Sequence, residues 1–404
     1  MPATSTAKTS ASAGPLTLAA YVSFVPIGIA TVLLGPMLPT LSARWSLNYA
    51  QAGALFTAQY LASTFAVALS GVLASCWGFR FPMKAGLWLV AAGLALLLAG
   101  PEWLGIACIA AYGAGLGLAV PAANLMVAAA NPERRSATLN LLNFFWSAGA
   151  VACPFLVAAA AKSHQIPLFL GFASVFCAVV AIGIAVMPAR IVELVPHRQV
   201  SPPIVPLVRK KLNAFLILGV LFLVYVGTEN AFGQWVASFS KSLGSMTLAV
   251  AVMTPSFFYA ALMIGRWLAP ALLRTMHEVK LVQAGLLLAC AGTTGLLFSQ
   301  GLSAVVASAC ATGLGLAAVY PITISLLSHE FGTASSRIGS VMFVLSNVGG
   351  GLFPWIVGLS SNRFGTLKAG LLVPLLGCVA MYVLYLREWR GMAVEESLES
   401  NTTI

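Results

Sequence analysis

Gly115-Leu116-Gly117-Leu118-Ala119 is a run of small and apolar residues that returns in the second half of the chain as Gly313-Leu314-Gly315-Leu316-Ala317. Three single residues recur as well, in the pairs Pro121 and Pro321, Gly149 and Gly349, and Pro154 and Pro354. Both copies lie inside long apolar segments, so the repeated unit is a set of membrane helices. Parallel repeats of this kind place a binding site between two halves near the bilayer midplane, which predicts a transport function.

The composition indicates that lipid is the solvent. Of the 404 residues, 60% are hydrophobic and only 8% are charged, whereas soluble domains carry about 25% charged residues. The mean hydropathy is +0.95. The net charge of +11 is typical of a basic membrane face, and we expect no nucleic-acid partner.

Residue patterns for catalysis and for metal binding are absent from the sequence. The seven cysteines include no CxxC pair, and the four histidines fall singly in expected loops. The sequence also lacks a Ser-His-Asp set, paired acids inside apolar segments and a nucleotide-binding motif. We therefore expect no enzyme activity, no cofactor and no metal.

A spanning helix needs about 20 apolar residues, and the sequence predicts an all-α membrane protein with twelve such helices. The expected segments are 17–41, 49–75, 81–100, 103–130, 137–161, 166–188, 213–239, 247–274, 279–299, 302–328, 337–361 and 367–387. They form two six-helix bundles of pseudo-symmetric sequence. The expected order is a disordered tail 1–16, a bundle 17–188, a cytoplasmic linker 189–212, a bundle 213–387 and a tail 388–404.

Basic residues predict the orientation. With twelve segments and an internal N-terminus, 16 of the 21 Lys and Arg residues fall on the cytoplasmic side. The positive-inside rule then places both termini in the cytoplasm. We expect a multi-pass protein of the inner (plasma) membrane, in contact with the lipid bilayer and monomeric.

These features resemble the major facilitator superfamily over essentially the whole chain, and two stretches resemble its fucose-permease branch of sugar:proton symporters. One stretch is Gly115–Asn124 with the downstream Leu139–Asn143, and the other is Tyr225–Trp235. The resemblance implies alternating access and a small-molecule solute moved with a coupling proton. It also implies that Asn143 and Trp146 contact a sugar.

The sequence departs from the superfamily pattern in two places. Ser75 replaces the Asp of the loop between the second and third spans, although Arg80 remains, so a charge-pair gate is not expected there. Gly35 and Val120 occupy the places of two acids that the branch carries in its first and fourth spans. A proton relay through that pair therefore cannot operate, and a facilitator without ion coupling stays open.

Glu229 is the one acid inside an expected span. An ionisable group at membrane depth is unfavourable unless it faces a cavity or a partner. It is predicted to hold the coupling ion, a proton or a sodium ion, or to accept a hydrogen bond from the solute. A structural role in bonding a neighbouring helix is the alternative. Tyr225 lies one turn earlier on the same face and would line the cavity.

Asn140, Asn143 and Ser147 form a polar stripe in the fifth span, and Asn347 belongs to its weaker copy in the eleventh. Such stripes either join helices or line an aqueous path, and bulky amides favour the path. The remaining candidates for substrate binding are the amides Asn124 and Gln59 and the aromatic residues Trp146, Tyr259 and Tyr320.

Arg266 follows Gly265 near the end of the eighth span. We interpret it as a side chain that extends to the membrane interface, with pairing to an anionic solute as the alternative. With no cation expected at the midplane, a strongly ionic solute is disfavoured.

The sequence therefore predicts a carrier of a small polar solute, a sugar or polyol, coupled to protons. An exporter of drugs or metabolites and a non-transporting receptor or scaffold are the alternatives. Neither the solute nor the direction of transport follows from the sequence.

Overall fold

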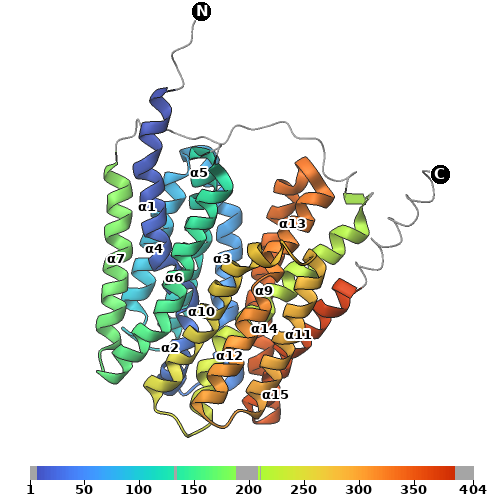
Figure 1. Ribbon diagram of the computed structural model, residues 1–404. Coiled ribbons are helices and arrows are strands. Elements are labelled where there is room, and N and C mark those ends of the chain that lie inside the picture. Colours follow the sequence, from blue (N-terminus) through green and yellow to red (C-terminus); the bar gives the residue numbers. More distant parts are fainter. Residues whose placement is uncertain (1–6, 132–133, 188–207, 210, 387–404) are drawn as a thin grey trace, which may run out of the picture. The chain divides into compact units, whose positions relative to one another are not determined.

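The structure, a computed structural model, describes residues 7–131, 134–187, 208–209 and 211–386. Every regular element within those ranges is helical (Figure 1). Contacts divide the chain into two compact units, each with its own core. The first unit is Met1–Val200 with Thr247–Ser256, and the second is Ser201–Met246 with Phe257–Ile404.

The helices follow the expected order. The first half contains α1 (Ala7–Val32), α2 (Leu34–Trp45), α3 (Tyr49–Trp77), α4 (Arg80–Leu96), α5 (Glu102–Ala130), α6 (Arg135–Lys162) and α7 (Ile166–Val186). The second half contains α9 (Leu212–Ser242), α10 (Leu248–Leu272), α11 (Glu278–Phe298), α12 (Leu302–Leu316), α13 (Val319–Phe331), α14 (Ser335–Phe364) and α15 (Leu367–Gly370). Residues 372–386 continue the last span as helix.

Length and composition confirm the predicted fold class. Eleven helical stretches among the described residues are long and apolar enough to cross a membrane, from Gly14–Val32 to Leu367–Leu386. The twelfth apolar segment is α4, which is 17 residues long. The protein is an all-α membrane protein with the predicted series of spans.

Two spans are broken at a proline. The break between α1 and α2 at Leu33 lies before Pro36, and the break between α12 and α13 lies before Pro321. Proline has no N–H, so the carbonyl four residues earlier loses its helical donor. For Pro36 this carbonyl belongs to Val32, and for Pro321 it belongs to Ala317. Each of these residues lies at the break in its span. The matching Pro121 lies inside an uninterrupted α5, so the two repeats differ at this point.

The repeat is visible in how glycines pack. A Cβ on Gly115 of α5 would lie 2.5 Å from the carbonyl oxygen of Gly86 in α4, and a Cβ on Gly285 of α11 would lie 2.5 Å from that of Gly315 in α12. The packing therefore matches Gly115 with Gly315, whereas the sequence run alone matches Gly115 with Gly313. The absence of side chains lets each helix pair approach closely.

Local sequence explains several helix ends. Asn48 caps α3 by accepting from the Gln51 N–H at 2.9 Å, while the Gln51 side chain accepts from the Asn48 N–H, a capping box. Gly365, with φ of 69°, ends α14 in the left-handed region that glycine adopts without strain.

Two of the expected domain limits can be compared with the starts of helices. Helix α1 begins at Ala7, inside the segment 1–16 for which a disordered tail is expected; its Ala-rich composition favours helix. Helix α9 begins at Leu212, the last residue of the expected linker. Most of the linker 189–212 and the whole tail 388–404 lie outside the described residues.

Candidate substrate and coupling site

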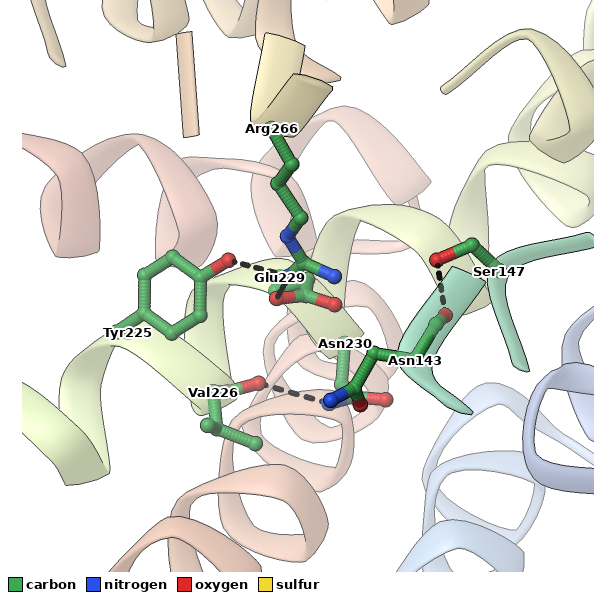
Figure 2. A network of polar contacts seen from close by, with 7 residues as sticks. All are labelled: Asn143, Ser147, Tyr225, Val226, Glu229, Asn230 and Arg266. Carbon is green, nitrogen blue, oxygen red and sulfur yellow. Dashed lines mark hydrogen bonds and ion pairs between the residues drawn. The ribbon is translucent and has the colours of Figure 1, made fainter. Parts of the chain in front are cut away.

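Glu229 forms an ion pair inside the second unit. It lies near the middle of α9, and its Oε2 is 3.3 Å from Nη2 of Arg266 in α10. The same Nη2 donates to the hydroxyl oxygen of Tyr225 at 3.1 Å. Tyr225 and Glu229 are four residues apart on α9, so one face of this helix holds the guanidinium (Figure 2).

Tyr320 of α13 completes this group. Its ring stacks on Tyr225 with centroids 5.3 Å apart and an interplanar angle of 30°. On another side it meets the ring of Phe222 edge-on at 5.6 Å. Tyr225, Glu229, Arg266 and Tyr320 are called the Glu229 cluster below. It joins three helices through one charge pair and one aromatic stack.

The cluster is largely shielded from solvent. The Glu229 side chain is 12% exposed and the Arg266 side chain 27%. Nε of Arg266 is buried and has no hydrogen-bond partner within the described part of the chain. Removing one member of a buried ion pair costs about 3–5 kcal/mol because the other charge is left uncompensated. The two charges therefore depend on each other.

The interpretation of Arg266 as an interface residue is wrong. It lies six positions before Leu272, the end of α10, which is a rise of about 9 Å. A long side chain at that distance can extend to the membrane interface or into the protein interior. Here the carboxylate of Glu229 and the hydroxyl of Tyr225 hold it inside the unit. We also expected no cation in the interior of the spans, and the pairing of Arg266 with Glu229 shows that this expectation is wrong.

Arg80, at the start of α4, has a different role. Its guanidinium donates to the carbonyl oxygens of Ile184 and Met187, at the end of α7. These are carbonyls that a helix C-terminus leaves without helical donors. Arg80 therefore links the start of α4 to the end of α7.

In the first unit, two predicted residues meet at Thr31 of α1. Trp146 of α6 donates from Nε1 to Oγ1 of Thr31 at 3.3 Å, and Gln59 of α3 donates to the carbonyl of Thr31 at 3.4 Å. The Gln59 oxygen accepts from the hydroxyl of Tyr112 at 3.4 Å. Gln59 is therefore a buried link between helices, whereas Trp146 is only half-buried.

The predicted stripe of α6 has its two amides on the surface of the first unit. Asn140 and Asn143 are exposed, and the Asn143 amide nitrogen donates to the carbonyl of Leu139 at 2.9 Å. Ser147 donates to the carbonyl of Asn143 at 2.9 Å (Figure 2). Asn124 of α5 is half-buried and donates to Val120 at 2.9 Å. In Asn124 and Asn143 a nitrogen is bonded to the residue's own helix, and the side-chain oxygen can accept from a solute.

The other candidates of the second unit lie outside the Glu229 cluster. Tyr259 is buried, and its hydroxyl packs where a Cβ on Gly233 would lie, one turn after Glu229. Asn347 of α14 is half-buried. Asn230, next to Glu229, donates to the carbonyl of Val226 at 2.9 Å and was not among the predicted contacts (Figure 2).

Sequence reasoning misassigned Arg266 and missed Thr31, two residues that organise these sites. Arg266 carries a signal, because it is a cation within one span when the preceding span holds a single acid. Thr31 carries none, since a threonine in an apolar helix usually bonds its own backbone, as it also does here to Ile27.

Comparison with known proteins decides the family. The family model described as Major Facilitator Superfamily matches residues 20–354, most of the chain. The chain belongs to the Major Facilitator Superfamily. As a member of this superfamily it is a multi-pass membrane transporter and not an enzyme.

Proteins with similar sequence or structure include the following. An uncharacterised transporter of Yersinia pestis is 23% identical over 311 residues, 76% of this chain and 79% of that protein. The nucleoside transporter NupG superimposes with a TM-score of 0.78 and 13% identity, over 93% of this chain and 99% of NupG. The fucose:proton symporter FucP of E. coli gives 0.62 and 20%, and a D-xylose–proton symporter 0.73 and 14%, each over 91% of this chain and 97% of theirs. These structural likenesses show the fold.

Proposed function

We propose that this transporter moves a small polar solute of the sugar or polyol class across the plasma membrane by alternating access, coupled to a proton on Glu229. The observation that carries the proposal is the Glu229–Arg266 pair, the one acid and cation that meet in the interior of the described spans. Structurally similar proteins are named as nucleoside, fucose and xylose transporters, whose solutes are rich in hydroxyl groups.

A proton suits Glu229 better than a sodium ion. A carboxylate takes up a proton without any further ligand, whereas a hard metal cation needs several oxygen ligands. The guanidinium 3.3 Å from Glu229 would also repel a sodium ion. We therefore assign proton coupling.

Solute contacts are proposed in both halves. Asn124, Asn140 and Asn143 in the first half and Asn347 in the second offer amides that can reach solute hydroxyls. Trp146, Tyr225 and Tyr320 offer aromatic faces of the kind that stack on the C–H faces of sugars. Gln59 and Tyr259 are buried, and we propose that they hold the solute-contacting residues in position.

The test is transport by the purified protein in liposomes. A panel of labelled monosaccharides, polyols, nucleosides and amphipathic drugs is offered with and without an inward proton gradient, and counterflow is measured in parallel. We expect counterflow and gradient-driven accumulation for hydroxylated solutes. Gradient-driven movement of the drugs alone would replace the proposal by the exporter, and binding without counterflow would indicate a receptor.

Asn143→Ala is expected to weaken solute binding by about tenfold, the effect of one hydrogen bond of about 1.4 kcal/mol. The matched control is Asn131→Ala. Asn131 donates to the hydroxyl of Thr17 at 3.1 Å and joins α5 to α1, so its loss should lower thermal stability and leave affinity unchanged. Solute titration of both variants is the measurement. An unaltered dissociation constant for Asn143→Ala removes this residue from the site.

A further inference from the structure

Resting on the proposed function, we propose that the solute carries one negative charge, as in a hydroxylated monocarboxylate, and that Arg266 binds this charge when Glu229 takes up its proton. The inference deepens the assignment of the Glu229 cluster. It names the chemical class of the solute and the reason why solute and proton move together.

The charge inventory of the spans carries the argument. The chain has no Asp, and its ten acids are all Glu. In the helices with assigned bounds, the other acids are Glu102 and Glu278 in first turns and Glu330 beside the end of α13, paired with Lys211. Every Lys and Arg of these helices other than Arg266 lies within five residues of a helix end. Within these helices, Glu229 is therefore the one acid that lies away from the helix ends.

Protonation of Glu229 creates a charge that needs a partner. With both side chains ionised the pair is neutral. A proton on Glu229 leaves the guanidinium uncompensated in a largely buried place, which is unfavourable. An anionic solute without the proton leaves one negative charge in excess. Binding both restores neutrality, with Glu229 as a neutral acid and Arg266 paired to the solute, so the two ligands favour each other.

The donors of Arg266 suit a carboxylate. Guanidinium presents five N–H groups in a planar fork that binds carboxylates through two parallel hydrogen bonds. Here Nη2 is shared between Glu229 and Tyr225, and the buried Nε has no acceptor in the described residues. A solute carboxylate on this edge would accept from Nε and would take the place of the Glu229 carboxylate on Nη2. The other titratable groups that face the pair are the hydroxyls of Tyr225 and Tyr320, which are neutral donors or acceptors.

The experiment compares sugar acids with their uncharged counterparts. Gluconate and galacturonate are titrated against glucitol and galactose at about pH 6 and about pH 8, where sugar carboxylates stay ionised. Wild type should bind the acids more tightly at the lower pH, by up to about tenfold per pH unit because one proton is taken up with each anion. Glu229→Gln, a mimic of the protonated state, should bind them with the same affinity at both pH values.

Variants of Arg266 complete the test. Arg266→Gln should bind the acids roughly 10- to 100-fold more weakly, and Arg266→Lys, which keeps the charge, should restore part of the affinity. Counterflow of the same four compounds by wild type separates the two proposals. Proton-driven transport of galactose or glucitol, with the acids excluded, overturns the anionic solute and leaves the proposed function intact. Counterflow of none of the four, nor of the wider panel, overturns both.

Discussion

Replacing Glu229 by Gln is expected to abolish solute accumulation driven by a pH gradient while solute-for-solute exchange continues. Gln keeps the size of the side chain and can still accept the hydrogen bond from Nη2 of Arg266, but it cannot carry a proton. A gradient of one pH unit supplies about 1.4 kcal/mol per proton, which is tenfold accumulation in wild type. The variant should bring internal solute only to the external concentration.

The measurement is uptake of labelled solute into liposomes with and without the gradient, with counterflow recorded for the same preparation. Glu102→Gln is the control, since it makes the same change at an acid in the first turn of α5 and leaves the Glu229–Arg266 pair in place. This control should accumulate solute when the pH gradient is applied, as wild type does. Full accumulation by Glu229→Gln would exclude Glu229 as the proton carrier.

Replacing Gly115 by Val is expected to prevent the first unit from folding into a stable protein. The added Cβ would lie 2.5 Å from the carbonyl oxygen of Gly86, and it meets backbone, which cannot rotate away. Overpacking of this kind costs about 3 kcal/mol or more, a large part of the stability of a typical domain. We expect loss of the monodisperse peak in size-exclusion chromatography after detergent extraction.

Two matched variants make this result specific. Gly315→Val adds the same side chain at the equivalent place in the second unit, against the backbone of Gly285 and Ala289, and should have a similar effect. Gly183→Val lies in α7, where an added Cβ meets nothing within 4 Å, and should behave as wild type. A stable Gly115→Val protein would contradict the close contact of α4 and α5.

Most of the fold could be predicted from the sequence because a membrane span needs only length and apolar composition. The described helices follow the order of the expected segments. The sequence did not predict correctly which residues of the two repeats correspond. The run Gly313–Ala317 copies Gly115–Ala119, yet backbone packing matches Gly115 with Gly315. Identity of small residues does not show which of them faces the neighbouring helix.

The site was predicted in part. Glu229 stood out because an acid within a span needs a partner, and its i, i+4 relation to Tyr225 correctly indicated one shared face. Arg266 was misassigned because a long side chain about 9 Å from a helix end can reach either the interface or the interior. Only the packing of α9 beside α10 decides between the two. The role of Gln59 as an interhelical link is likewise a property of tertiary contacts with Thr31 and Tyr112.

Proton movement by the unmodified protein tests the central claim most directly. Liposomes containing wild type, with equal pH on both sides and a pH-sensitive dye in the external medium, receive a transported solute from outside. One proton should enter with each solute, so the external medium turns alkaline in proportion to solute uptake, and a proton ionophore should collapse the signal. Solute uptake without any change of external pH would contradict proton coupling at Glu229.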